Sequence, residues 1–299
     1  MITFIIKEFN EGFERVSTMI EQLNAVNYTI PLHLIFVSGS PFHALSWIQS
    51  SADFPVRIVG NVKSSGGAIN TGALLAPPSS DALIIFDCHI CFSTPTIARM
   101  INTLTRYPNS LVGFAIRSST FPGCEYEERT HYGVTLRVVD FPFEWVWLPP
   151  HPDEDVFEVS MVDGCAFALK PPVFRHLYEY GGFLSDYYGV GWEEEAGIRL
   201  WRIGNSVRCD TKAVVGHMFK SSWSSESTRG WLVSRCQGIV ANIFDTELYD
   251  QVCAVCENYW GQEHFRKELK RAEEKVGWIR RKLEPLKERI DERWFLRTT

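Results

Sequence analysis

The 299-residue sequence lacks the features that direct a chain to a membrane or to nucleic acid. Its first residues carry no basic segment ahead of their short apolar run, so they do not resemble a secretory signal. No stretch approaches the roughly 20 apolar residues of a membrane-spanning helix. Positive charge is not in excess, since 36 acidic residues outnumber 30 basic ones. We therefore expect a cytoplasmic protein with no membrane span that is not a general nucleic-acid binder.

Cysteine is present, but not in a pattern that fixes a structure. In the cytosol we expect all eight cysteines to be reduced. Two Cys-x-x-Cys pairs, Cys88/Cys91 and Cys253/Cys256, have a spacing that zinc ligands use. The pairs lie far apart in the chain, and the first spans a predicted strand end, where alternate side chains point to opposite faces. We therefore favour buried thiols over a structural zinc site.

What the chain does contain is an alternation of short apolar runs with helix-like segments. This alternation predicts an α/β fold, with a mixed, mostly parallel sheet flanked by helices. Strands are expected at residues 2–7, 32–37, 56–62, 81–86, 111–116 and 159–169, and helices at residues 11–23, 42–49, 66–75, 95–105 and 193–201. Residues 121–152 favour a meander or a long loop over the sheet edge, and the serine-rich residues 221–227 are a candidate mobile lid.

The end of the chain has a different pattern. We expect a catalytic domain over residues 1–245 and a C-terminal helical extension over residues 246–299. Pro285 should kink the last helix. Two interpretations stay open: this helix packs on its own domain, or the chain self-associates through the 265–290 helix. Apolar residues follow steps of four and three at Phe265, Leu269, Ala272, Val276, Ile279, Leu283, Leu286 and Ile290.

The most informative segment is an apolar run that ends in Asp87-Cys88-His89. A strand with this ending brings a carboxylate and an imidazole to the carboxyl edge of a sheet, where open α/β sheets bind ligands. Oxygen and imidazole nitrogen suit Mn²⁺ or a similar divalent ion such as Mg²⁺. Such an ion neutralises the charge that grows on a departing diphosphate. By itself, however, an Asp-x-His motif is also compatible with a strand-end Asp beside a hydrogen-bonded His.

Six further segments accompany Asp87-Cys88-His89 in a fixed order. They are Phe9-Asn10-Glu11 and residues 66–72, 143–147, 162–168, 191–201 and 215–220. Together the seven resemble motifs of the polypeptide N-acetylgalactosaminyltransferase catalytic domain and, more broadly, of the family 2-like GT-A glycosyltransferases. The resemblance extends over roughly 70% of the chain. It implies a GT-A (Rossmann-like) fold and a metal-dependent transfer of a sugar from a nucleoside-diphosphate donor, with UDP favoured and anomeric configuration retained.

The resemblance also implies roles for particular residues. The metal ligands would be Asp87, His89 and His217. Glu193, and after it Glu194, would orient the acceptor hydroxyl or accept its proton. The donor-binding residues would be Phe9, Asn10, Glu11, Gly66, Gly67, Asn70, Asp87, Asp163, Gly164 and Trp147. Each has a structural alternative: a buried histidine, acidic residues that complement a helix dipole, a tryptophan in the core, or glycines used for chain geometry.

Departures from the family pattern leave the substrates open. Ser38-Gly39-Ser40 stands where the family has an Asp pair that holds the nucleoside, and Ile69 stands where it has an arginine. Asp163 replaces a glycine near the sugar pocket, so a hexose or an N-acetylhexosamine is possible. The acceptor is expected to be a peptide or protein, a glycan, or a hydroxymethylated DNA base. A nucleotidyltransferase that forms sugar nucleotides and a non-catalytic sugar- or partner-binding module are the alternatives.

Overall fold

The centre of the fold is a sheet whose middle strands are apolar at nearly every position. β1 (Ile2–Glu8) is buried along its whole length and lies between two parallel neighbours, β2 (Leu32–Ser38) and β4 (Ala82–Asp87). Strands of this composition need cover on both faces. The computed structural model describes residues 1–9, 11–40, 45–120, 124–138, 144–151, 153–184, 192–219, 225–292 and 296–298.

The sheet is mixed and mostly parallel, as the sequence predicts. Its strand order is β10-β12-β6-β11-β4-β1-β2-β3, with β11 antiparallel between β4 and β6. β12 runs parallel to β6 and extends to the site described below. The remaining strands of the path are β3 (Val56–Val59), β6 (Ser110–Ser119), β10 (Val156–Glu158), β11 (Ala166–Leu169) and β12 (Ser206–His217).

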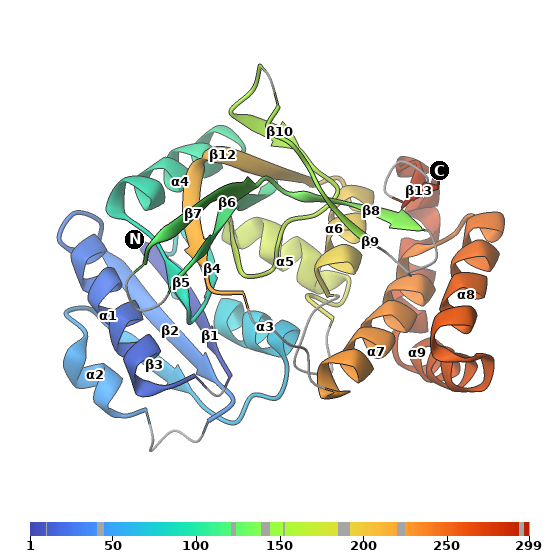
Figure 1. The fold of residues 1–299 in the computed structure, drawn as a ribbon, viewed down its shortest axis with the longest axis horizontal. Helices are drawn as coiled ribbons and strands as arrows, with labels where there is room; N and C mark the ends of the chain where they lie inside the picture. The colour runs from blue at the N-terminus through green and yellow to red at the C-terminus, as the bar shows by residue number, and fades with distance from the viewer. Residues whose placement is uncertain are drawn as a thin grey trace.

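Helices cover both faces of the sheet (Figure 1). Alternate residues of β1 point to opposite sides, so Phe4 and Ile6 join one apolar cluster and Ile5 joins the other. The first cluster is covered by α1 (Phe13–Asn27), α2 (Trp47–Ser51) and α4 (Thr94–Arg106). The second is covered by α3 (Ser65–Leu75), α5 (Pro171–Glu179), α6 (Trp192–Arg202), α7 (Ser225–Asn242), α8 (Thr246–Trp260) and α9 (Gln262–Leu283).

The segment after β6 forms strands. β7 (Tyr126–His131) pairs with β6, and β5 (Ile90–Cys91) pairs with β12. β8 (Val134–Val138), β9 (Glu144–Trp147) and β13 (Leu296–Thr298) make a second, three-stranded sheet. The strand expected at residues 159–169 is shorter, because regular pairing there is confined to β11. Of the candidate lid, residues 225–227 begin α7, and residues 221–224 lie outside the described part of the chain.

The apolar seam of the last helix packs within the chain. Phe265, Val276 and Ile279 are buried in the cluster that the sheet shares with α7. α9 ends at Leu283, and Pro285 lies in the 3-10 helix η2 (Glu284–Arg289), consistent with the expected break. The seam therefore stabilises this chain's own fold, which is the first of the two interpretations. Self-association and the 1–245/246–299 domain division stay predictions.

The expectation that all cysteines are reduced is wrong for one pair. Cys91 and Cys124 form a disulfide that joins β5 to the turn between β6 and β7. Cys91 is therefore not free to act with Cys88 as half of a zinc site. Six cysteines, including Cys253 and Cys256, are free thiols.

Among the helices of the described residues, none combines the length and the apolar character of a membrane span.

Candidate functional site

The register of the parallel strands brings two opposite charges together at the carboxyl edge of the sheet. Lys7 of β1 is the direct neighbour of Asp87 of β4. Lys7 Nζ lies 2.8 Å from Asp87 Oδ1 and also donates a hydrogen bond of 2.8 Å to the Gly164 carbonyl oxygen. The lysine is buried, whereas a quarter of the Asp87 side chain, 26%, remains exposed. Asp87 thus stands at an open edge with one oxygen already engaged.

A short antiparallel pairing brings the two histidines to Asp87. In this pairing Ile90 of β5 lies opposite His217, the last residue of β12, so His89 lies beside the end of that strand. His89 Nε2 is 3.0 Å from His217 Nε2, and the two rings are stacked with centroids 4.9 Å apart. His217 Nε2 is in turn 3.8 Å from Asp87 Oδ2. Residues 128 positions apart in the sequence therefore face the same point.

The geometry of these three residues fits a divalent ion. Asp87, His89 and His217 each offer a ligand atom, and these atoms lie within 4.8 Å of one another. In the described ranges no other group of three or more His, Cys, Asp or Glu side chains does so. Two imidazole nitrogens 3.0 Å apart match adjacent ligands of one ion, because bonds of about 2.1 Å at a right angle separate them by about 3 Å. A neutral pair of rings shares at most one proton across that distance.

The charges around Asp87 favour its ionised form. Burial alone would raise the pKa of the Asp87 carboxyl, but Lys7, His89 and His217 outweigh burial and lower that pKa below its ordinary value. The carboxylate is therefore the form present at neutral pH. This is the form that a hard divalent ion requires as a ligand.

Behind His89 lies Glu11, for which the family resemblance predicts a position near the donor nucleobase. Glu11 Oε1 is 3.1 Å from His89 Nδ1, the ring nitrogen that faces away from His217. Arg15, one turn into α1, forms an ion pair with the same carboxylate. A carboxylate behind a ligating histidine fixes the orientation of the ring. Glu11 therefore lies directly behind one of the candidate metal ligands, and its predicted contact with the donor stays a prediction.

The other residues of this predicted turn are only partly placed. Phe9 packs against the apolar cluster, and Asn10 lies outside the described residues. At the end of β2, the buried Ser38 hydroxyl donates to Glu8, and the Ser40 backbone amide donates to the Ser38 hydroxyl oxygen. Ser38 is thus tied to β1 at the position where the family has its Asp pair.

The glycine-rich helix start has a local structural explanation. Ser64 caps α3 by accepting the Gly67 amide, and a side chain at Gly67 would collide with that cap. Gly66 is buried in the same turn. Asn70 makes two 3.0 Å hydrogen bonds with the Phe183 backbone, next to Gly182 at a positive φ of 65°. The Asn70 amide is therefore engaged with the α5–α6 connection.

The Asp163–Gly164 segment is joined to the metal side by Lys7. The Gly164 carbonyl oxygen accepts the Lys7 ammonium, and Asp163 Oδ1 accepts the Cys165 amide at 2.9 Å. Burial raises the pKa of Asp163, and the charge of Asp87 adds to the effect. The Cys165 carbonyl oxygen accepts the Asp87 amide at 2.8 Å. This predicted sugar-binding segment is therefore fixed directly to the strand that carries Asp87.

The predicted acceptor residues lie at the start of α6. Glu193 is buried there, and the side chain of Glu194 lies outside the described residues. The next acid of the run, Glu195, is structural: it forms an ion pair with the fully buried Arg199 and accepts the Leu184 amide. Trp147 lies on β9, half-buried, with its ring 4.4 Å from that of His131. The donor contact of Trp147 stays a prediction.

Sequence reasoning missed Lys7 and the Cys91–Cys124 disulfide. Lys7 follows five strand residues of which four are apolar, and a charge at that position resembles an ordinary strand end. The charged pair Lys7-Glu8 directly precedes the Phe9-Asn10-Glu11 turn, and this position could have indicated that Lys7 lies near the site. The disulfide had no such signal, because its cysteines are 33 positions apart and belong to no common motif.

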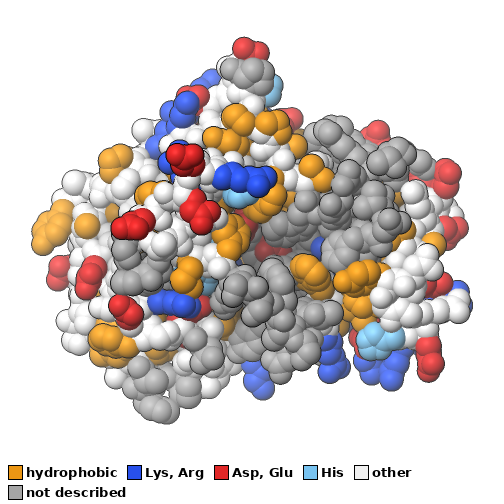
Figure 2. Space-filling model, in the orientation of Figure 1, with side chains coloured by type: hydrophobic (Ala, Val, Ile, Leu, Met, Phe, Trp, Pro, Cys, Tyr) orange, Lys and Arg blue, Asp and Glu red, His pale blue; other side chains and the backbone are white. Residues whose placement is uncertain are grey.

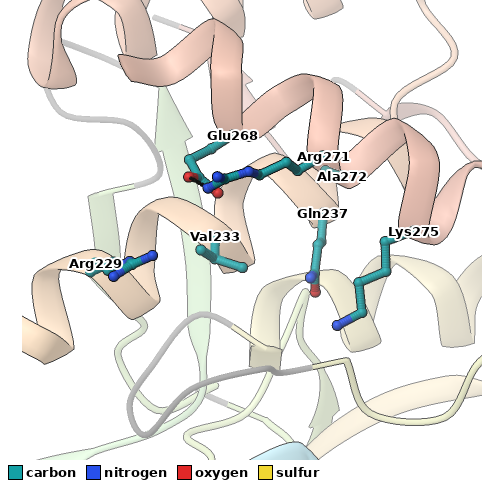
Figure 3. A pocket seen from close by; sticks show the side chains of 7 residues that line it. All are labelled: Arg229, Val233, Gln237, Glu268, Arg271, Ala272 and Lys275. Carbon is teal, nitrogen blue, oxygen red and sulfur yellow. Dashed lines mark hydrogen bonds and ion pairs between the residues drawn. The ribbon is translucent and has the colours of Figure 1, made fainter.

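Two further features are visible on the surface. In the space-filling view the middle of one face is hollowed, with side chains of both charges around it (Figure 2). A separate cavity of about 390 Å³ lies between α7 and α9 (Figure 3). Arg229, Arg271 and Lys275 contribute to its wall, and Arg271 forms an ion pair with Glu268. The lining residues are Arg229, Val233, Gln237, Glu268, Arg271, Ala272 and Lys275.

Comparison with known proteins defines the fold as GT-A. No family model matches the sequence, and no curated protein matches it. Among solved structures, the chain is similar to GalNAc-T7 determined with UDP, GalNAc and Mn²⁺, with a TM-score of 0.65 and 16% identity. The match covers 83% of this chain and 50% of that one, so this chain spans half the length of GalNAc-T7. At this identity the likeness shows the fold alone.

A second solved structure is the mannosyltransferase PcManGT from Pyrobaculum calidifontis, in complex with GDP-Man and Mn²⁺. It matches with a TM-score of 0.46 and 16% identity, over 91% of this chain and 73% of that one.

Proposed function

We propose that this protein is a metal-dependent glycosyltransferase that transfers a hexose or N-acetylhexosamine from a nucleoside-diphosphate donor to an acceptor hydroxyl. One observation carries the proposal: Asp87, His89 and His217 converge at the carboxyl edge of a GT-A sheet. Ligands of open α/β sheets bind at this edge. The solved structure of GalNAc-T7, which shares the fold, holds UDP and Mn²⁺.

The three residues would hold Mn²⁺ or another divalent ion such as Mg²⁺. When bound, such an ion neutralises charge on the leaving diphosphate. His89 and His217 present their Nε2 atoms, and Glu11 fixes the His89 ring from behind. Asp87 presents Oδ2, because Lys7 engages Oδ1. The chain thus supplies a site of two nitrogens and one oxygen that leaves coordination positions for phosphate oxygens and water.

The acceptor side rests on α6. Glu193 sits in the first turn of this helix, and we assign it the task of orienting the acceptor hydroxyl, with Glu194 as the neighbouring candidate. The transfer is proposed to retain the anomeric configuration. The acceptor is proposed to be a peptide or protein, a glycan, or a hydroxymethylated DNA base. Mass spectrometry of these acceptors after incubation with the donor would identify which one gains a sugar, and NMR of fresh product would give its anomeric configuration.

The donor nucleotide is best found by binding, since Ser38-Gly39-Ser40 stands where the family has its Asp pair. Calorimetry and thermal shift with UDP-, GDP-, CMP- and dTDP-sugars, each with and without Mn²⁺, should show metal-dependent binding of one donor, with UDP-sugars favoured. His89→Ala and His217→Ala should abolish this binding. His264→Ala, at an exposed position of α9, is the matched control and should bind as the wild type does. Failure of every donor to bind would overturn the catalytic proposal.

A further inference from the structure

Lys7 is an unusual residue for its position. It continues a strand of buried apolar residues and is itself only 4% exposed. Lysine is rarely buried without a partner, because removing an ammonium from water is costly. Here the ammonium contacts the Asp87 carboxylate and the Gly164 carbonyl oxygen, each at 2.8 Å. A cation is thus built into the fold directly behind a ligand of the proposed metal site.

This contact changes what Asp87 offers to an ion. Oδ1 is bonded to Lys7, so Oδ2, on the side of His217, is the oxygen that remains for a metal. The charge of Lys7 also cancels that of Asp87. On the other side of the site, Arg15 in the same way balances Glu11. With neutral imidazoles, a bound divalent ion would keep nearly its whole double positive charge for an anionic ligand.

We propose that Lys7 is a positioning residue that makes the divalent ion and the donor diphosphate bind as a cooperative pair; this inference rests on the proposed function. Lys7 repels an ion that enters the empty site, which weakens binding of the metal alone. The same positive charge attracts the diphosphate once it arrives, which strengthens binding of the metal and diphosphate together. The coupling between the two ligands is reciprocal by thermodynamic linkage.

A purely structural role for Lys7 makes a different prediction. If Lys7 only held Asp87 and the Gly164 segment in place, its loss would disorder the site and weaken both ligands in the same direction. If Lys7 sets the charge of the site, its loss would shift the two affinities in opposite directions. The sign of each change therefore separates the two roles, whatever their size.

The test is calorimetry on the full chain with Mn²⁺ alone, and with UDP at saturating Mn²⁺. In Lys7→Met we expect Mn²⁺ alone to bind more tightly and UDP to bind more weakly, with the coupling reduced about tenfold. Lys7→Arg keeps the positive charge, so the coupling between Mn²⁺ and UDP should stay close to that of the wild type. Lys267→Met, at an exposed position of α9, is the control and should match the wild type.

Three results would count against the proposal. Weakening of Mn²⁺ and UDP together in Lys7→Met, or no change in either, would overturn the role of Lys7 and leave the proposed function intact. A wild type that binds neither Mn²⁺ nor UDP would overturn the proposed function and this inference with it. If thermal unfolding shows that Lys7→Met does not fold, Lys7→Gln takes its place, because it keeps a donor for the Gly164 carbonyl oxygen. The same changes in Mn²⁺ and UDP affinity are then expected, and the same results would overturn the proposal.

Discussion

Two clusters of buried charged and polar side chains among the described residues are built differently. Arg202, the last residue of α6, donates to the carbonyl oxygen of Asn242, which ends α7, and to that of Lys287. It also forms an ion pair with Glu292. Glu292 in turn accepts the backbone amides of Phe244 and Asp245 at 2.9 Å. At the sheet edge, in contrast, two histidines turn their Nε2 atoms toward each other next to Asp87.

The difference between these clusters is whether the protein itself completes the bonding. A helix C-terminus leaves carbonyl groups without partners, and arginines placed there bond them and complement the helix dipole. The guanidinium group of Arg202 and the carboxylate of Glu292 are therefore both engaged by protein groups, and the cluster serves stability. The nitrogens at the sheet edge face each other across a distance that suits an ion. Polar side chains thus build a support in one place and a candidate metal site in the other.

The largest expected effect belongs to the C-terminal cluster. Arg202→Met leaves Glu292 as a buried charge without its arginine, so we expect a loss of about 3–5 kcal/mol in the free energy of unfolding. Urea denaturation measures this loss, with Arg175→Met, at an exposed position of α5, as the control. The folded variant should bind Mn²⁺ as the wild type does. Loss of Mn²⁺ binding at full folding would contradict the separation of the two clusters.

The disulfide should give the next largest effect. Replacing Cys91 and Cys124 by serine removes a cross-link over 33 residues, which should cost about 3–4 kcal/mol of unfolding free energy. Urea denaturation with and without a dithiol should show that the wild type responds to the reductant and the double variant does not. Denatured, non-reduced wild type should titrate as six thiols. A count of eight would show that the bond is not formed.

Metal binding should stabilise the sheet edge by a smaller amount. At a Mn²⁺ concentration of about 100 times its Kd, linkage predicts about 2.7 kcal/mol of added stability. His217→Ala should remove this increment and change the stability of the metal-free protein little, because the pair of rings is not needed to complete any helix end. Chemical denaturation with Mn²⁺ and with EDTA measures both quantities. A large loss of metal-free stability would mean that the histidines are structural.

The smallest effect concerns Asp163, whose raised pKa comes mainly from burial. Folding favours the protonated carboxyl, so stability should fall as pH rises from about 3.8, the unfolded value, through the raised folded pKa. Asp163→Asn should lack this decline and should be more stable than the wild type above that range. Unfolding at several pH values in EDTA tests this, with the exposed Asp53→Asn as the control. An equal decline in the variant would assign it to other groups.

The sequence predicted much of this because its signals are local. Apolar runs bounded by turns mark β1, β2 and β4, whose pairing follows from burial on both faces. The Asp87-Cys88-His89 motif depends on the end of one strand. His217 was predicted from a resemblance of short segments, and the β5–β12 pairing places it beside His89.

What the sequence could not predict depends on contacts between distant segments. Lys7 meets Asp87 because β1 and β4 pair in one register, and a shift of one residue would turn Lys7 to the other face. The contact of Glu11 with His89 likewise joins two distant segments, and the predicted contact of Glu11 with the donor stays a prediction. For the seam of the last helix the sequence leaves two partners open, since apolar periodicity does not specify what covers it.

By itself, then, the sequence determined the α/β class, the strand ends that carry Asp87 and His217, and the apolar face of α9, because hydrophobic periodicity and turn residues act over a few positions. The tertiary structure alone decided that Lys7 engages one oxygen of Asp87, that Cys91 bonds Cys124, and that α9 packs on α7. These are pairings between segments that lie tens of residues apart in the sequence. Their geometry is fixed by sheet register and helix packing, which no local pattern encodes.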